Sequence, residues 1–335
     1  MSQRVTTGLG RAAVAFGLLG ATLLALPSAP ASAGTDPEAL LRDAREASED
    51  VTLAGIVEVR WRDGDSMHVE RTGARSRAGA YVIGHGERFA VGAEGARWTA
   101  HDGIATAWGH EHGQEPPRPG ATWELELDDP AEVAGREAYV VVASLDDGTE
   151  RARFYVDKDL GLLLRRDVLQ EDGGLERSVR FTHLAAEGVA PAVPAVPGGA
   201  PTPTPTDDVG PRFVAPEELE PGFRLLGRYE HPDGIVQLFY GDGLFSLSIF
   251  EQPGSLDWGS LPEGGHRGTV GDERAAAYAS PAGTVGVWAR DALVLTGVSD
   301  APPEIAHEAI ASIDGDGDGF LTELVDFVLG PFGWN

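Results

Sequence analysis

The sequence contains no cysteine, only two methionines and a single lysine, Lys158, among its 335 residues. Without cysteine the protein can form neither disulfides nor thiolate metal sites, and thiol catalysis and thiol-based redox sensing are excluded. Its stability must therefore come from packed cores, which a chain of this length can build. The 25 arginines beside one lysine indicate a high-G+C genome rather than any particular chemistry.

Recognisable catalytic motifs are also missing. The sequence has no phosphate-binding loop, no dinucleotide fingerprint and no Gly-x-Ser placed between the strand and helix that a nucleophile elbow needs. The acidic pairs Asp128-Asp129 and Asp146-Asp147 are expected in turns, where adjacent carboxylates diverge instead of converging on a substrate. A binding protein is therefore favoured over an enzyme, and a hydrolase whose site no motif reveals is the weaker alternative.

Basic charge is scarce. Fifty-three acidic residues give the chain a formal charge of −27. Such a chain repels nucleic acids and anionic membrane surfaces, which argues against nucleic-acid binding. The acidity could attract a basic partner segment or divalent cations, although solubility is the simpler explanation for it.

Residues 1–33 have the features of a cleaved signal peptide. Two arginines precede the apolar run Ala12–Leu26, and Ala31-Ser-Ala33 supplies the small residues of a cleavage site. An uncleaved anchor helix is the alternative, but the run is short for a membrane span of ~20 residues and ends at Pro27. We expect an exported, extracytoplasmic protein that begins at Gly34 and carries a charge of −29, because the removed segment holds two arginines and no acid.

Residues 34–187 are expected to form one domain. Asp36 followed by Pro37 indicates a helix start, and the apolar pattern continues to about Glu49. From Leu53 to His183, strand-like segments alternate with Asp-Gly and similar turns, as in consecutive antiparallel hairpins. One helix followed by many strands predicts a curved, partly closed antiparallel sheet around the helix.

A linker and a smaller domain follow. Residues 188–211 include Pro201-Thr-Pro-Thr-Pro-Thr206, which favours extended polyproline geometry and predicts a semi-rigid spacer. Residues 212–313 are expected to form an α+β domain of seven strands, closed by a helix over Pro303–Ile313. Within it, Phe239–Phe250 reads as a strand, a tight turn and a second strand. An ordinary hairpin is the simplest interpretation of that unit.

Two motifs in order resemble one family. Tyr240-Gly-Asp-Gly-Leu-Phe-Ser-Leu-Ser248, which follows Pro221-Gly-Phe-Arg-Leu225, resembles the C-terminal domain of the RseB/MucB family. The segment from Val133 through Asp147-Gly-Thr149 to Asp167 is similar to the end of that family's N-terminal domain, with Leu163 and Leu164 where the family usually has Leu-Pro. The matched regions cover about half of the mature chain. The motif residues in the C-terminal domain are Asp242, Gly243, Leu244, Phe245 and Ser246.

The resemblance implies both a fold and a function. The fold would be a half-open antiparallel β-barrel around a helix, as in LolA-type lipoprotein carriers, followed by a smaller C-terminal α+β domain. The function would be that of an exported regulator, which binds the extracytoplasmic part of a membrane anti-sigma factor and shields it from proteolysis until lipid enters the N-terminal cavity. An extracytoplasmic lipid or lipoprotein carrier is the alternative, although a simple carrier needs only the cavity.

Large aromatic side chains are the candidates for lining such a cavity. A dry aromatic core without a ligand is an equally good interpretation. The candidates are Trp61, Phe89, Trp98, Trp108, Trp123, Tyr139 and Phe154.

Residues 314–335 form a separate unit in the sequence. Asp314, Asp316 and Asp318 match the first half of a calcium-binding loop, and calcium is the one cofactor that the sequence suggests. The position of the bidentate glutamate is Val325, however, so an acidic flexible arm is the favoured interpretation. The amphipathic helix expected over Phe320–Leu329 should dock on protein, because its apolar surface is broad. Elsewhere, His110-Glu-His112 could hold a metal, but a solvated loop is favoured there.

Overall fold

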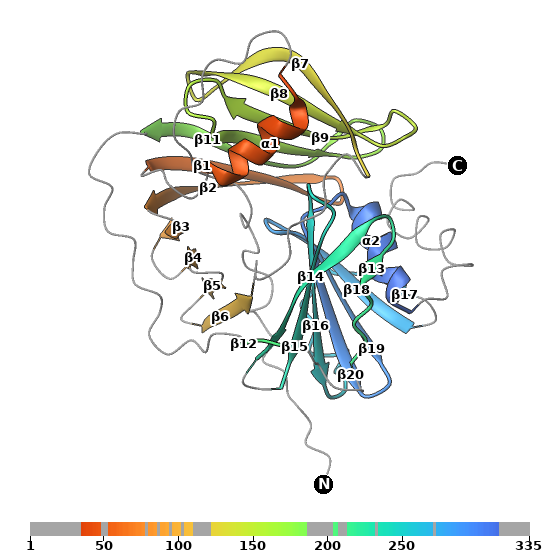
Figure 1. The fold of residues 1–335 in the computed structure, drawn as a ribbon. Coiled ribbons are helices and arrows are strands. Elements are labelled where there is room, and N and C mark those ends of the chain that lie inside the picture. The colour runs from red at the N-terminus through yellow and green to blue at the C-terminus, as the bar shows by residue number, and fades with distance from the viewer. Residues whose placement is uncertain are drawn as a thin grey trace.

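The computed structural model describes residues 35–47, 53–77, 80–85, 88–93, 96–101, 104–109, 122–185, 204–206, 213–231, 234–270 and 273–314. The described residues form two antiparallel sheets that belong to two adjacent domains (Figure 1). The predicted signal peptide, the His110-Glu-His112 segment and residues 315–335 lie outside the described residues. Within the described part, no helix is long and apolar enough to cross a membrane.

The first domain begins with α1 (Pro37–Glu46). The Asp36 carboxylate accepts a hydrogen bond from the Glu38 N–H at 3.1 Å, and Pro37 occupies the first turn, as predicted. Ala44 is buried and Leu40 and Leu41 pack beside it against the sheet. The helix is shorter than the sequence suggested, since it ends at Glu46.

The first sheet has 11 strands in the described residues, in the order β6-β5-β4-β3-β2-β1-β11-β10-β9-β8-β7. Neighbours along the chain pair as hairpins, and β1 and β11 join the two runs of hairpins. The strands are β1 (Leu53–Asp63), β2 (Ser66–Arg77), β3 (Ala80–His85), β4 (Arg88–Ala93), β5 (Ala96–His101), β6 (Ile104–Gly109), β7 (Glu124–Val133), β8 (Arg136–Ser144), β9 (Glu150–Asp157), β10 (Leu163–Leu169) and β11 (Leu175–Ala185).

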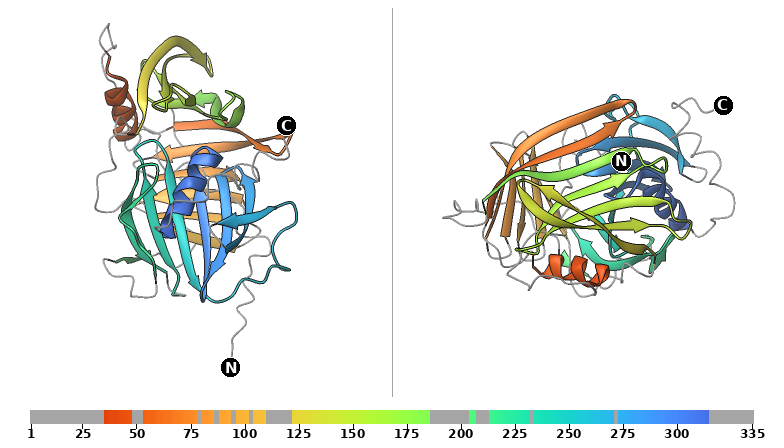
Figure 2. Two further views of the ribbon diagram at one scale, coloured as in Figure 1. Left: turned by 90° about the vertical axis from the view of Figure 1, so that its right-hand side faces the viewer. Right: turned by 90° about the horizontal axis from the view of Figure 1, so that it is seen from above.

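This sheet is open and curved. Its order starts at β6 and ends at β7, and seen from above the strands bend round toward α1 (Figure 2). The predicted fold, a half-open antiparallel sheet around a helix with a smaller second domain, is confirmed. We call the face that carries α1 the inner face and the opposite face the outer face.

One predicted turn is wrong. Asp128 and Asp129 lie inside β7, which continues to Val133. The pairing of β7 with β8 shifts register between Asp128 and Ala131, and this interval contains Pro130. Proline has no N–H to give to a ladder, so the strand bulges there instead of turning.

The second sheet has nine strands in the described residues, with most of them in the order β12-β14-β15-β16-β20-β19-β18-β17. Its strands are β12 (Thr204–Pro205), β13 (Glu218–Leu219), β14 (Phe223–Glu230), β15 (Val236–Gly241), β16 (Ser246–Pro253), β17 (His266–Val270), β18 (Glu273–Ser280), β19 (Gly283–Arg290) and β20 (Leu293–Ser299). The predicted closing helix is present as α2 (Pro303–Ala311), continued by the 3-10 turn η2 (Ser312–Asp314).

The predicted linker contributes to this sheet. Thr204 and Pro205 form β12 and pair with Glu230 and Tyr229 of β14, and the Thr206 N–H donates to the Arg228 carbonyl at 2.9 Å. The proline-rich sequence limits this pairing to a short strand at the sheet edge. Residues 204–206 of the predicted linker are therefore attached to the C-terminal domain.

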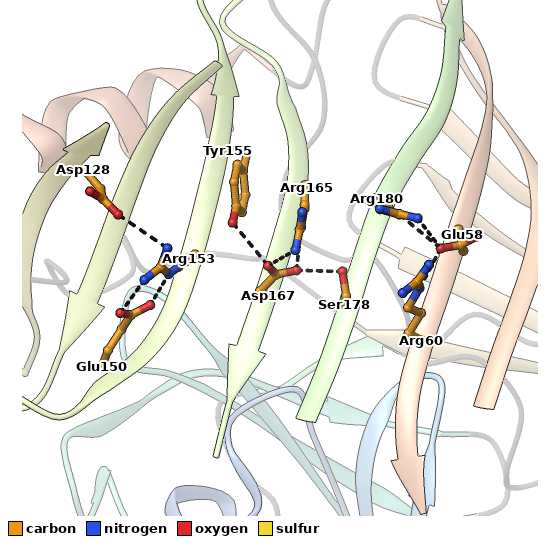
Figure 3. A network of polar contacts seen from close by, with 10 residues as sticks. All are labelled: Glu58, Arg60, Asp128, Glu150, Arg153, Tyr155, Arg165, Asp167, Ser178 and Arg180. Atoms are coloured by element: carbon orange, nitrogen blue, oxygen red, sulfur yellow. Dashed lines mark hydrogen bonds and ion pairs between the residues drawn. The ribbon is translucent and has the colours of Figure 1, made fainter. Parts of the chain in front are cut away.

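The outer face of the first sheet carries a row of polar side chains (Figure 3). In the register of the sheet, Tyr155, Arg165 and Arg180 lie side by side on β9, β10 and β11. Glu58 of β1 continues the row and is fully buried. Its carboxylate accepts hydrogen bonds from Arg60 at 2.7 Å, Arg71 at 2.6 Å and Arg180 at 2.8 Å.

These arginines determine the charge state of Glu58. Burial alone would raise the pKa of Glu58, but the hydrogen bonds from Arg71, Arg60 and Arg180 outweigh it and lower the pKa to about 2. Since the folded-state pKa is lowered, the carboxylate contributes stability at neutral pH that is lost as the pH falls from about 4.5 toward 2.

Replacing Glu58 by glutamine should lower the free energy of unfolding by about 2 kcal/mol at pH 7, because three arginines lose a charged acceptor. Urea denaturation measures this change, and the loss should shrink as the pH approaches 2. Glu126→Gln, at an exposed position on β7, is the matched control and should change little. Equal effects of the two substitutions would contradict the expectation.

Candidate functional site at the interdomain junction

The two domains meet in one continuous core. Trp123 and Phe154 of the first domain and Phe245 of the second belong to the same buried cluster. The Trp123 and Phe245 rings are 5.3 Å apart between centroids and tilted by 58°. Ala44 of α1 lies in this cluster as well. We call this contact region, together with the polar groups described below, the junction.

The turn between β15 and β16 is the centre of the junction. Gly243 has φ +96°, a conformation that favours glycine. The Asp242 carboxylate accepts the Leu244 N–H at 2.8 Å and the Phe245 N–H at 2.6 Å, which closes the turn. Its other oxygen accepts the indole N–H of Trp123 at 3.0 Å. A single carboxylate thus shapes the turn and binds the other domain.

The buried position of Asp242 disfavours the charged form of its carboxyl group. Burial raises the pKa of its carboxyl to about 6, and the hydrogen bonds from Phe245, Leu244 and Trp123 offset only part of that rise. The negative charge of nearby Asp300 raises it further. Below about pH 6 the carboxyl is therefore protonated in the folded protein.

Arg166 of β10 provides the main ionic contact across the junction. Its guanidinium pairs with the Asp300 carboxylate at 2.5 Å and donates to the Leu244 carbonyl at 3.0 Å. It also lies over the Phe245 ring, 4.6 Å from the centroid. Arg166 pairs in register with Phe154, so both side chains belong to the inner face. One side chain therefore contacts three groups of the second domain.

Arg177 of β11 makes a second set of contacts. It donates to the Ala282 carbonyl at 2.6 Å and to the Asp300 carbonyl at 2.9 Å. Burial lowers the pKa of Arg177 to about 10, so the guanidinium stays charged at neutral pH. Burial would raise the pKa of Asp300, but the charges of Arg166 and Arg177 and the N–H of Ser246 lower it. The Ser246 N–H lies 2.7 Å from the carboxylate.

Smaller contacts extend the junction. Arg45 of α1 donates to the Gly243 carbonyl at 3.4 Å. A Cβ at Gly222 would lie 2.5 Å from the Thr122 hydroxyl, so only glycine fits at this approach of the two domains. Arg151 of β9 pairs with Glu304 of α2. The junction therefore includes contacts from α1, β9, β10 and β11 of the first domain.

The structure places the sequence-predicted motif residues here. Asp242, Gly243, Leu244, Phe245 and Ser246 all contact the junction or form its turn. Sequence reasoning missed Arg166, Arg177 and Asp300. A charged residue within a strand gives no local sign of facing another domain, and only the register opposite Phe154 and Val168 identifies the two arginines.

The seven aromatic residues predicted to line a cavity lie in different parts of the structure. Trp123 and Phe154 belong to the junction core. Trp61 stacks on His68 with centroids 5.3 Å apart, and the Lys158 ammonium lies 5.2 Å from the Tyr139 ring centroid. Phe89, Trp98 and Trp108 are on β4, β5 and β6, where only the backbone is described.

The calcium candidates fall at or beyond the end of the described residues. Asp314 ends η2, and Asp316 and Asp318 lie outside the described part. Among the residues that are described, no group of three or more His, Asp or Glu side chains is placed to hold a metal ion. The calcium prediction therefore stays a prediction.

Comparison with known proteins gives one clear relative. The chain is 35% identical over 144 residues to the sigma factor AlgU regulatory protein MucB of Pseudomonas aeruginosa. The resemblance to the RseB/MucB family is confirmed. The match spans 40% of this chain and 45% of MucB, so less than half the length of that relative is covered. No family model matches the chain.

Solved structures show weaker similarity. The complex of Pseudomonas aeruginosa MucA and MucB has a TM-score of 0.49 at 22% identity, over 82% of this chain and 97% of the matched chain. MucB solved with MucA(peri) has a TM-score of 0.46 at 23% identity, over 82% and 97%. A LolA superfamily protein from Nitrosomonas europaea has a TM-score of 0.22 at 8% identity, over 80% and 92%.

Proposed function

We propose that this protein is an exported regulator that binds the extracytoplasmic part of a membrane anti-sigma factor and protects it from proteolysis. The observation that carries the proposal is the 35% identity to MucB, a sigma factor regulatory protein that has been solved in complex with MucA. The proposed export rests on the features of residues 1–33. In this role the protein acts by binding and needs no catalytic group.

The junction supports a regulator more than a carrier. A lipid carrier needs only a cavity in the first domain, whereas here a shared core and two arginines, Arg166 and Arg177, join that domain to a second one. A change in the first sheet would reach the Asp242–Ser246 turn directly through Trp123 and Arg166. Such a connection is what a regulator requires if lipid in one domain is to alter partner binding by both.

The lipid part of the proposal concerns the inner face. Trp61 and Tyr139 lie outside the junction core, so they are the described aromatic candidates that a ligand could still contact. A lipid that favours one arrangement of the sheet would shift partner affinity only through its differential affinity for the two arrangements. We therefore expect bound lipid to lower the affinity for the partner, and bound partner to lower the affinity for lipid, although the two occupy different sites.

The test uses the mature protein and the purified extracytoplasmic segment of a membrane anti-sigma factor from the same organism. Calorimetry should show a saturable complex, and proteolytic digestion of the segment should slow about tenfold or more in that complex. Heat-unfolded protein is the control for nonspecific protection. A segment that is neither bound nor protected would refute the proposal.

A second arm tests lipid sensing. Adding a lipopolysaccharide or phospholipid preparation to the complex should weaken binding and restore digestion. Protein that protects the segment equally with and without lipid would remove the lipid role while leaving the regulatory one in place.

A further inference from the structure

The outer face of β1 and β2 carries an unusual combination of exposed aliphatic and cationic side chains. Among the described residues, five large hydrophobic side chains are exposed, and three of them are here: Ile56 at 44%, Met67 at 37% and Val69 at 54%. Strand alternation and register place them on one face, with Val69 opposite Arg60 and Met67 opposite Arg62. Single exposed aliphatic residues are ordinary, but here Val69 and Met67 are neighbours on β2, and Ile56 lies on the same face beyond Glu58 and Arg71.

The same face has an excess of positive charge. Arg60, Arg71 and Arg180 all bind one carboxylate, that of Glu58, which is itself fully buried. Three cations on one anion leave two positive charges on the surface of a chain whose formal charge is −27. The Arg71 side chain is 67% exposed. This face is therefore electrostatically distinct from the protein as a whole.

The arginines keep donors for a partner. Arg60 and Arg71 each contact Glu58 through Nε alone, so the Nη groups of both guanidinium forks are not engaged by Glu58. Because Glu58 fixes these side chains from below, little rotational freedom remains to be lost on binding. Guanidinium groups held in this way recognise carboxylates well.

We propose that this face, defined by Ile56, Arg60, Met67, Val69, Arg71 and Arg180, is a docking surface for an acidic, aliphatic-bearing segment of the protein partner. This inference rests on the proposed function and names the chemistry of the partner and the surface that receives it. Carboxylates of the segment would pair with Arg60, Arg71 and Arg180, and its aliphatic side chains would cover Val69 and its neighbours.

A peptide segment fits this face better than a membrane does. An anionic bilayer would meet the whole negatively charged molecule and be repelled by it. A narrow segment meets only the locally positive strands, and it can supply carboxylates and aliphatic groups together. Charge complementarity of this kind sets specificity and association rate, so the interaction should weaken at high salt.

Val69→Glu tests the surface without removing a partner of Glu58. The new carboxylate stands opposite Arg60 and would compete for the arginines, so affinity for the extracytoplasmic anti-sigma segment should fall about tenfold or more. Leu127→Glu is the matched control, because Leu127 is 41% exposed on the same sheet and pairs with Val141 of the inner face. It should change affinity less than about twofold. Urea denaturation of both variants checks that they fold.

The outcomes separate this inference from the proposed function. Wild-type binding that Val69→Glu leaves intact overturns the docking surface alone, whereas absence of wild-type binding overturns both. Two further measurements address other occupants. If wild-type protein sediments with phosphatidylglycerol vesicles and Val69→Glu does not, the face binds a membrane and the inference is overturned. If wild-type protein forms a dimer that Val69→Glu dissociates, the face binds a second copy of the chain and the inference is likewise overturned.

Discussion

Replacing Arg166 by alanine should lower the free energy of unfolding by about 3 kcal/mol or more at pH 7. The substitution leaves the Asp300 carboxylate in the junction without its closest cation, removes the donor to the Leu244 carbonyl and uncovers the Phe245 ring. Arg177 is 4.0 Å from the same carboxylate and compensates in part. Urea denaturation monitored by tryptophan fluorescence measures the loss.

The shape of the transition is informative as well. Because Arg166 connects the domains, its loss should separate one cooperative transition into two, with the domains unfolding independently. Arg42→Ala on α1 is the control, since Arg42 pairs with Asp43 at a mostly exposed position and should contribute less than about 1 kcal/mol. A variant of Arg166 that is as stable as the control would show that the junction is not an energetic link.

Asp242→Asn should remove a pH dependence of stability between about pH 4 and pH 6. The pKa of Asp242 is raised to about 6 by burial, so the folded protein holds this proton more tightly than the unfolded chain does. The stabilisation is therefore complete below about pH 4 and is lost as the pH rises through 6. The pKa of Asp242 in the folded protein is about two higher than its ordinary value, and this difference corresponds to about 3 kcal/mol of stability.

The measurement is the difference in unfolding free energy between wild type and Asp242→Asn, taken at several pH values. Glu176, Glu251 and His307 also have shifted pKa values, but both proteins contain them and they cancel in the difference. Trp123→Phe removes the indole donor and keeps the carboxyl, so its pH dependence should persist at somewhat higher pH. A difference that is flat from pH 4 to pH 7 would disprove the expectation.

Local patterns in the sequence predicted the elements of this fold well. Asp36 and Pro37 located the start of α1, and glycine-containing turns located several hairpins, among them those at Asp63-Gly64, Asp147-Gly148 and Asp172–Gly174. These features depend on residues within a few positions of one another, where capping and backbone conformation act directly. The motif around Asp242 was likewise visible as a turn, and the family resemblance identified it as important.

Long-range features were not predictable in the same way. The contact of Asp242 with Trp123 joins residues 119 positions apart, and the pairing of Arg166 with Asp300 joins residues 134 positions apart. The inward orientation of Arg166 depends on a register shift in β10, between Leu163 and Arg165. A one-residue shift moves a side chain to the opposite face, so alternation in the sequence alone could not place it. The bulge in β7 between Asp128 and Ala131 is also a feature of strand pairing, so the sequence was wrongly interpreted as a turn there.

If the chain is exported as proposed, the pairing of β1 with β11 has a consequence for how it folds. The strands that meet at the middle of the first sheet, Leu53–Asp63 and Leu175–Ala185, come from opposite ends of that domain. A chain that crosses a membrane from its N-terminus can form the β1–β6 hairpins early, but β1 keeps an unpaired edge until β11 arrives. Slow emergence of residues 64–174 should therefore prolong an aggregation-prone intermediate, which an extracytoplasmic chaperone that covers strand edges would protect.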